Sequence, residues 1–422
     1  MPGKSNRLLT TRIVGQQVDA YYDEVLRARG SGKKVGWWFG FPMFPLLRAQ
    51  DIVYLHGEGY AARVAGRKEE KALQTVAEDD GWSMEACSYA RCHIGGSILA
   101  QKGVPQGMTV TPLANVPPPD FVISCNPGCS TEIHWFDHIR RRFNVPGFHI
   151  TVPHNWLGTI GEKEEATQEV LKQLQDCVQF LEDMTGRPYN WEKLKAVMRE
   201  TQLAATSRKE AMLQCRNIPA PATFFDWAVS LAPVNILQGA PGTADYFAKV
   251  KEEIEGRVAR KEGAVPGERF RLYWDGIMVW NRLGWLAEKF ASFESTVVCG
   301  RYTHLGFLHR PEFIDQEKPL ESLAANVAWL QINQSLDTLT SWISELCEYY
   351  RIDGIVAANM RTCRPFAGMQ LEVIDGVARR LGIPATYFDA DMTDANFISD
   401  AQVDTKLQAL LETITARRRV RA

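Results

Sequence analysis

Cysteines in loop-like settings are the residues of this chain best suited to chemistry. Cys87, the pair Cys125 and Cys129, and Cys363 stand in three separate loops rather than on a helical face. Cys125 and Cys363 each follow a short apolar stretch, and a helix is predicted to begin after Cys129 and after Cys363. Thiolates carried by such loops are ligands for iron–sulfur clusters and for zinc. The sequence therefore predicts a metal centre or a redox site.

The spacing of these cysteines bears on which metal they would hold. Structural zinc sites usually contain ligand pairs separated by about two to four residues. Cys125 and Cys129 provide one such pair, but no second tight Cys or His pair completes it, and Cys363 is far away in the chain. Single cysteines from distant loops suit a cluster between domains better, and zinc remains the alternative.

The remaining cysteines of the nine in the chain have simpler interpretations. Cys177 and Cys347 fall on apolar helical faces, and free cysteine behaves there as a small buried hydrophobe. Cys215 and Cys299 are also expected to be buried. Cys92 lies five residues after Cys87, on a different face of a predicted helix, and is not expected to share a site with it.

Apolar stretches alternate with helical patterns on both sides of a long helical region. Strands are expected at 34–39, 51–55, 121–124, 147–152, 270–274, 296–299, 354–358 and 385–388. Strands that alternate with helices indicate α/β parallel sheets with crossover helices. We predict three domains: an N-terminal α/β domain over 1–160, a helical domain over 161–262 and a C-terminal α/β domain over 263–422.

Composition excludes several classes of function. The net charge of −2 over 422 residues offers no basic surface for nucleic acid. No apolar run approaches the roughly 20 residues of a membrane span, and no signal peptide is recognised, so a cytoplasmic location is expected. Gly30-Ser31-Gly32-Lys33-Lys34 lacks the residues of a phosphate-binding loop, so ATP hydrolysis, if involved, belongs to another chain.

Several motifs, taken in order, resemble the 2-hydroxyacyl-CoA dehydratase / benzoyl-CoA reductase family over nearly the whole chain. They are Gly36-Trp37-Trp38-Phe39-Gly40-Phe41-Pro42, His56-Gly57-Glu58-Gly59-Tyr60, Cys87-Ser88-Tyr89-Ala90-Arg91, Cys129-Ser130-Thr131, Cys363-Arg364-Pro365 and Asp389-Ala390-Asp391. Within the family, the chain looks most like the larger cluster-bearing subunit of ATP-dependent benzoyl-CoA reductase. The resemblance implies two flavodoxin-like parallel-sheet domains plus a helical domain.

The resemblance also implies a cofactor and partners. The cofactor would be a 4Fe-4S cluster held by Cys87, Cys129 and Cys363, with Cys125 as the alternative to Cys129. The implied partners are a homologous cluster-bearing sister subunit, an ATP-hydrolysing iron–sulfur activator component and an aryl- or acyl-CoA substrate. The implied reaction is reduction of the benzoyl-CoA ring to a cyclic dienoyl-CoA. The alternatives are radical water elimination from an (R)-2-hydroxyacyl-CoA, and a non-catalytic subunit that relays electrons or shapes the site.

Polar and aromatic residues expected near the pocket are the candidates for the rest of the site, and Glu58 among them follows a predicted strand end. Glu58, His56 and His93 are the predicted catalytic residues, because a reduced thioester needs a proton donor close by. Trp37, Phe39 and Tyr60 are the predicted substrate-binding residues, since aromatic rings can form the wall of a pocket for an aromatic acyl group.

Overall fold

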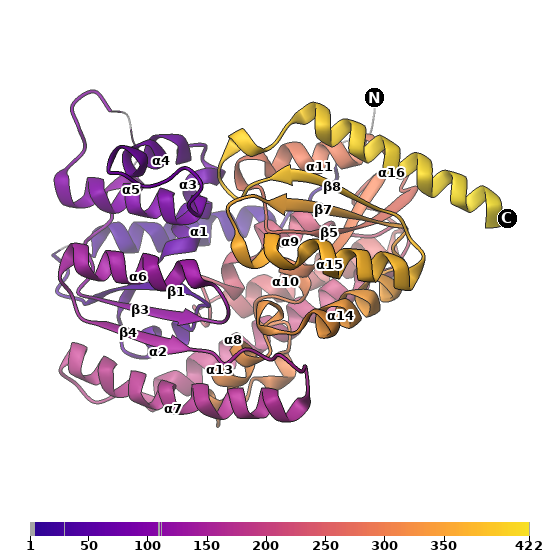
Figure 1. Cartoon of the computed structure of the whole chain (residues 1–422). Helices are drawn as coiled ribbons and strands as arrows, with labels where there is room; N and C mark the ends of the chain where they lie inside the picture. The colour runs from indigo at the N-terminus through magenta and orange to yellow at the C-terminus, as the bar shows by residue number, and fades with distance from the viewer. Residues whose placement is uncertain (1–4, 29, 109, 111, 422) are drawn as a thin grey trace.

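Two four-stranded, all-parallel sheets organise the chain (Figure 1). The computed structural model describes residues 5–28, 30–108, 110 and 112–421. The first sheet contains β1 (Val35–Gly40), β2 (Val53–His56), β3 (Phe121–Asn126) and β4 (Gly147–Thr151), and the second contains β5 (Phe270–Asp275), β6 (Ser295–Gly300), β7 (Gly354–Met360) and β8 (Ala385–Ala390). The predicted α/β class with two parallel-sheet regions is confirmed.

Both sheets have the same strand order. The first sheet has the order β2-β1-β3-β4 and the second has the order β6-β5-β7-β8. In each sheet the first strand of the chain lies next to an edge strand, and the order in which the strands are added changes direction once. This is the start of the flavodoxin-like order, in which ligands bind beyond the strand ends where the order reverses. In this chain those points lie between β1 and β3 and between β5 and β7.

Burial explains why these stretches form strands. Every residue of β1, β2, β5 and β6 is buried, and strands without an exposed face are typical of parallel sheets covered on both sides. The helices of the first half are α1 (Thr11–Arg27), α2 (Phe44–Ala49), α3 (Gly57–Gly66), α4 (Glu70–Asp79), α5 (Ser88–Lys102) and α6 (Ser130–Phe143). Those of the second half are α11 (Leu283–Ser292), α12 (Arg301–His304), α13 (Pro319–Ala328), α14 (Leu336–Tyr349), α15 (Arg364–Leu381) and α16 (Asp400–Arg421).

Four helices stand between the two sheet regions in the sequence. They are α7 (Ile160–Thr185), α8 (Trp191–Leu213), α9 (Phe224–Val229) and α10 (Thr243–Ala259). In Figure 1 the two sheets lie on opposite sides of the molecule, with α7 and α8 below and between them. α8 packs against α10 and α2, and α7 packs against α13 and β4, so these helices contact both sheet regions. None of the helices in the described ranges combines the length and apolar character needed to cross a membrane.

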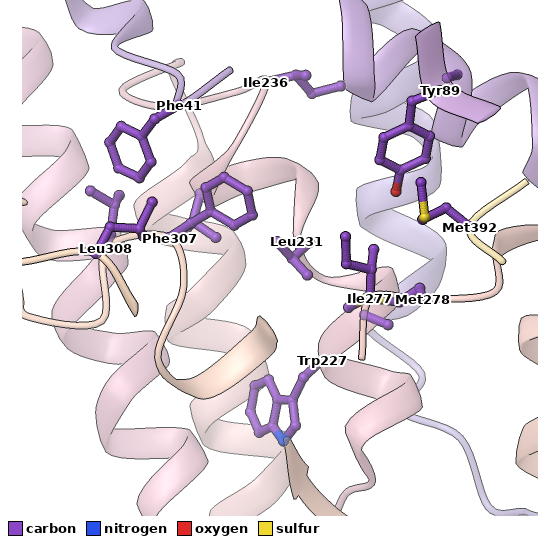
Figure 2. Close-up of a cluster of buried hydrophobic side chains, with 14 of the residues drawn as sticks. Phe41, Tyr89, Trp227, Leu231, Ile236, Ile277, Met278, Phe307, Leu308 and Met392 are labelled. Atoms are coloured by element: carbon purple, nitrogen blue, oxygen red, sulfur yellow. The ribbon is translucent and has the colours of Figure 1, made fainter. Parts of the chain in front are cut away.

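Side chains from both sheet regions meet in a buried apolar cluster, and Figure 2 draws part of it. Labelled members are Phe41, Tyr89, Trp227, Leu231, Ile236, Ile277, Met278, Phe307, Leu308 and Met392. Polar contacts cross the same junction: Arg91 of α5 donates to Asp394 at 2.8 Å, and Asn281 donates to Glu70 at 2.8 Å. The two strand-end regions are therefore held face to face.

Candidate functional site

A cavity of about 80 Å³ lies where the carboxyl ends of the two sheets face each other. Its walls include Gly40 at the end of β1, Phe41 directly after it, Cys129 after β3, Ile277 after β5 and Cys363 after β7. Both points at which the strand order reverses therefore open onto one space, as expected for ligand sites of such sheets. The remaining lining residues are Glu58, Cys87, Tyr89, Pro127, Glu132, Tyr302, Gly306, Phe307, Leu330, Gln331, Ile332, Pro365, Phe366 and Met392. We call this cavity the cysteine pocket.

The structure brings Cys87, Cys129 and Cys363 together in the wall of the cysteine pocket. Each is the residue that precedes the first turn of a helix: Cys87 of α5, Cys129 of α6 and Cys363 of α15. The positive ends of three helices therefore surround the pocket and favour negative charge in it. This arrangement suits sulfur ligands in the thiolate form.

Burial opposes ionisation of these thiols in the metal-free protein. It raises the pKa of Cys87 to about 12 and the pKa values of Cys129 and Cys363 well above that of a free thiol. Nearby backbone N–H groups of each helix act in the opposite direction, but less strongly. Thiols must lose protons to bind metal, so a bound cationic centre would have to compensate for this desolvation.

The spread of the cysteines bears on what they can hold. Within the described part of the chain, no group of three or more His, Cys, Asp or Glu side chains is arranged to hold a metal ion. A single zinc ion needs sulfurs at about 2.3 Å. Cysteines spread around one cavity instead suit a larger inorganic cluster with several metal atoms. The donor set, all sulfur, is the kind that iron–sulfur clusters use.

Two carboxyl groups lie beside the cysteines. Glu58, in the first turn of α3, and Glu132, in the first turn of α6, both line the pocket, and their carboxyl groups interact electrostatically. Burial raises the pKa of both, and the neighbouring charge of Glu58 raises that of Glu132 further. The Glu58 side chain is 22% exposed, whereas Glu132 is buried. The pair therefore binds a proton more readily than exposed carboxyl groups do.

Gly40 makes room for this carboxyl pair. Its φ of +77° is in the left-handed region, which favours glycine. A Cβ atom at this position would lie 2.3 Å from Oε2 of Glu132 and 2.2 Å from the carbonyl oxygen of Cys125. A side chain at residue 40 would therefore displace Glu132.

The other predicted catalytic residues lie outside the cysteine pocket. His56 is fully buried as the N-cap of α3, where its Nδ1 accepts from the Gly59 N–H at 3.3 Å and its Nε2 lies 3.0 Å from the Gly40 carbonyl oxygen. Burial lowers its pKa to about 4. These contacts fix the junction between β2 and α3. The distance from His56 Nε2 to Glu58 Oε2 is 4.0 Å.

His93 lies in an aromatic cluster together with the predicted substrate-binding residues. Its ring centroid is 4.7 Å from that of Trp37 and 5.4 Å from those of Phe39, Tyr60 and Trp135. Trp37, Phe39 and Tyr60 are at most 1% exposed, and none lines the cysteine pocket. The structure places these residues in the core beside the pocket rather than on its wall.

Cys125 and Cys129 occupy different environments. Cys125 is fully buried within β3, whereas Cys129 lines the pocket. Cys92 is buried between Gln74 and Thr393, and Cys177, Cys215, Cys299 and Cys347 are buried as well.

Sequence reasoning missed several wall residues. Glu132 stands three residues after Cys129, in the first turn of the following helix, a position that would have been a usable signal. Tyr302 and Phe366 also line the pocket, from α12 and α15. Thr362, next to Cys363, accepts from the backbone N–H of Ser88 at 3.0 Å, so it connects the loops of Cys363 and Cys87. No local pattern distinguishes Tyr302, Phe366 and Thr362 from ordinary core positions.

Comparison with known proteins identifies the family of this chain. Residues 45–414 match the family model described as 2-hydroxyglutaryl-CoA dehydratase, D-component. The chain belongs to this family. The resemblance drawn from the motifs is thereby confirmed, and the relatives of this chain include proteins named as dehydratase subunits and as a reductase subunit for CoA thioesters.

Individual relatives of this chain are distant but cover nearly its full length. It is 26% identical to the alpha subunit of lactoyl-CoA dehydratase from Anaerotignum propionicum, over 97% of this chain and 98% of that protein. It is 25% identical to the (R)-2-hydroxyisocaproyl-CoA dehydratase alpha subunit of Clostridioides difficile, over 99% and 98% of the two chains. It is 24% identical to a benzoyl-CoA reductase subunit of Thauera aromatica, over 96% and 94%.

Proposed function

We propose that this chain is the iron–sulfur subunit of a benzoyl-CoA reductase, which reduces the aromatic ring of an aryl-CoA to a cyclic diene. The observation that carries the proposal is the convergence of Cys87, Cys129 and Cys363 with a buried carboxyl pair in one apolar pocket. Aromatic walls favour an aromatic acyl group: Phe41, Tyr89, Tyr302, Phe307 and Phe366 line the pocket.

Cys87, Cys129 and Cys363 would hold the [4Fe–4S] cluster. When bound, it would supply electrons of very low potential, since iron–sulfur potentials reach roughly −700 mV. An ATP-hydrolysing activator would deliver these electrons, because the chain has no phosphate-binding loop of its own. A homologous sister subunit would complete the enzyme, in keeping with the subunit names of the relatives.

The residues of the chain would have three tasks. The apolar and aromatic wall would exclude water from a strongly reducing site. The helix ends that position the cysteines would also favour negative charge that develops on the thioester carbonyl. Glu58, the more exposed carboxyl of the pair, would transfer a proton to the reduced substrate, and Glu132 would hold the proton before transfer.

A second candidate function is the dehydration of an (R)-2-hydroxyacyl-CoA. The relatives named as dehydratase alpha subunits favour it. The same carboxyl pair would then exchange protons with the substrate during loss of water. The two reactions differ in electron count, because ring reduction consumes two electrons per turnover and dehydration returns its electron. A non-catalytic relay chain would bind neither substrate.

The test begins with anaerobic purification of the chain with its sister subunit. We expect iron and sulfide in the protein, and ring reduction of benzoyl-CoA once activator and ATP are supplied, at two electrons per product. Turnover of 2-hydroxyacyl-CoA without net electron consumption would favour the second function. Protein without iron, or without activity towards either substrate class, would contradict the proposal.

Replacement of single cysteines tests the ligand set. Cys363→Ala should abolish iron binding and activity, because the remaining cysteines cannot complete the set. Cys125→Ala is the matched control, since Cys125 is buried but does not line the pocket. Iron content is measured on both variants. Full iron in Cys363→Ala, or loss of iron only in Cys125→Ala, would show that the ligand assignment is wrong.

A further inference from the structure

A short, tightly turned segment of the second sheet region forms one side of the cysteine pocket. It runs from Tyr302 in α12 to Phe307, and Tyr302, Gly306 and Phe307 all line the pocket. We call residues 302–307 the wall segment. A Cβ atom at Gly306 would lie 2.2 Å from the carbonyl oxygen of Tyr302, so the turn is closely packed. Leu308, the next residue, has a φ of +50°, which residues with a side chain rarely adopt. Such a conformation needs contacts from other elements to hold it.

Arg208 of α8 provides these contacts. Its guanidinium donates to the carbonyl oxygen of Thr303 at 2.5 Å and, over a longer distance of 3.4 Å, to that of Phe307. The two acceptors lie near the two ends of the wall segment. A planar guanidinium with several donors can reach both carbonyl groups at once, whereas the single ammonium group of a lysine cannot reproduce this geometry.

Burial of Arg208 is unfavourable for the stability of the fold. The residue is only 2% exposed, and burial lowers its pKa to about 10, so the side chain is still charged at neutral pH. In the described part of the chain, no carboxylate pairs with Arg208, and its acceptors are the two carbonyl oxygens of the wall segment. A buried charge without a counter-charge costs free energy, so packing alone would favour an apolar residue at this position.

Aromatic rings connect the wall segment to the rest of the pocket. The ring of Phe307 stacks on that of Phe41, which follows β1, with centroids 6.0 Å apart and an interplanar angle of 15°. Figure 2 shows Phe41 and Phe307 among the side chains that meet between the two sheet regions. The ring of Tyr302 packs edge-on against Phe307 at 5.5 Å and lies 6.1 Å from that of Phe366. All four rings line the pocket, so a shift of the wall segment would change the shape of its aromatic side.

We propose that Arg208 is a positioning residue, which holds the wall segment so that Tyr302 and Phe307 limit the size of the acyl group that the cysteine pocket accepts. This inference rests on the proposed function, because it takes an aryl-CoA as the substrate. Arg208 does not line the pocket, so it acts through the wall segment rather than on the substrate. Loss of its contacts should therefore relax the selection by acyl size more than it slows turnover.

Two substitutions of Arg208 separate its charge from its geometry. Arg208→Lys keeps the charge and reaches one carbonyl group, whereas Arg208→Gln removes the unpaired charge and can still donate one hydrogen bond. Arg257→Lys is the matched control. Arg257 of α10 is also buried, at 3% exposed, and donates to the carbonyl oxygens of Asn6 at 2.7 Å and Pro221 at 3.0 Å, but none of these residues lines the cysteine pocket.

The experiment measures kcat and KM of the full-length chain, purified anaerobically with its sister subunit and supplied with activator and ATP. The substrates are benzoyl-CoA and the larger para-methylbenzoyl-CoA. The wild type should prefer benzoyl-CoA, and the ratio of the two kcat/KM values should fall by about tenfold in both Arg208 variants, because a pocket that has lost its shape no longer rejects one extra methyl group. The KM for benzoyl-CoA should rise more than its kcat falls. Iron content should be unchanged, and Arg257→Lys should keep the wild-type ratio.

A double variant tests whether Arg208 acts through Phe307. Phe307→Leu changes the pocket wall directly and should lower the same ratio. Arg208→Gln combined with Phe307→Leu should lower it no further than Phe307→Leu alone, because residues that act through one wall are not additive. Amide hydrogen exchange of the same preparations, read by mass spectrometry, should be faster in Arg208→Gln than in the wild type for peptides that cover residues 302–307, and unchanged around Cys87.

The outcomes separate this inference from the proposed function. If the wild type reduces benzoyl-CoA and both Arg208 variants keep its substrate ratio, Arg208 does not position the wall and the proposed function is untouched. Equal loss of activity towards both thioesters, additive effects in the double variant, or failure of Arg208→Gln to fold would show that Arg208 serves stability alone, and would overturn the inference as well. If the wild-type enzyme reduces no aryl-CoA, the proposed function fails, and this inference fails with it.

Discussion

At the scale of a single residue, burial in the core beside the cysteine pocket determines the protonation state of His93. It is 1% exposed and surrounded by aromatic rings, and its Nδ1 accepts from Trp135 Nε1 at 3.2 Å. Burial lowers its pKa to about 3. The folded protein therefore keeps this imidazole neutral, whereas an unfolded chain takes up a proton below about pH 6.5.

This difference predicts a pH-dependent loss of stability. Since the unfolded state binds the extra proton, the stability due to neutral His93 falls as pH falls below about 6.5. Between pH 7 and pH 5, the wild type should lose about 2 kcal/mol more free energy of unfolding than His93→Gln. Urea denaturation of the metal-free chain at several pH values measures this difference. His134→Gln, at an exposed position of α6, is the control. Parallel pH profiles for wild type and His93→Gln would contradict the prediction.

At the scale of elements, the site is built where loops from the two sheets are connected by hydrogen bonds. The Thr362 hydroxyl, just after β7, donates to Asp391 at 2.7 Å and accepts from the N–H of Ser88 at 3.0 Å. Asp391, just after β8, also accepts from the Thr362 N–H at 3.0 Å. This network is buried, and it connects the loop of Cys363 to the start of α5, which Cys87 precedes.

Thr362→Val should loosen this connection. Valine has a similar shape but leaves the Ser88 N–H without its acceptor, which costs about 1–3 kcal/mol when the group is buried. We also expect faster alkylation of Cys87 and Cys363 by iodoacetamide in the metal-free chain, measured by mass spectrometry. Thr413→Val on the exposed surface of α16 is the control. Unchanged alkylation rates would mean that the network does not position the cysteine loops.

At the scale of the whole molecule, the site requires that the two sheet regions keep their position relative to each other. Arg91 of α5 is fully buried; it pairs with Glu78 of α4 and, across the junction, with buried Asp394. Its Nε donates to the carbonyl oxygen of Ala86, beside Cys87. A single guanidinium therefore connects the N-terminal cysteine loop to the loop after β8.

Arg91→Met should be strongly destabilising. Removing one partner of a buried ion pair leaves the other charge uncompensated, which costs about 3–5 kcal/mol. Urea denaturation should show this loss, and the double variant Arg91→Met with Asp394→Asn should recover part of it. Lys195→Met, which breaks the exposed pair with Glu317, should cost much less, because water and salt screen an exposed ion pair. An equal loss of stability in Arg91→Met and Lys195→Met would rule out a special role for the buried pair.

Much of this arrangement could be predicted from local sequence. All eight strands lie within a few residues of their predicted positions, because buried parallel strands form apolar runs that end at turns. Cys87, Cys129 and Cys363 stood out for a related reason, since each follows a loop and precedes a helix. Both signals depend only on neighbouring residues in the chain.

Only the tertiary structure decided which side chains meet. It placed His56, Trp37, Phe39 and Tyr60 in the core rather than on the pocket wall. It brought Glu132 and Tyr302 to the wall, and Cys129 rather than Cys125. The physical reason is that local pattern specifies strands, helices and turns, whereas the wall of a cavity between two sheets depends on how distant elements pack.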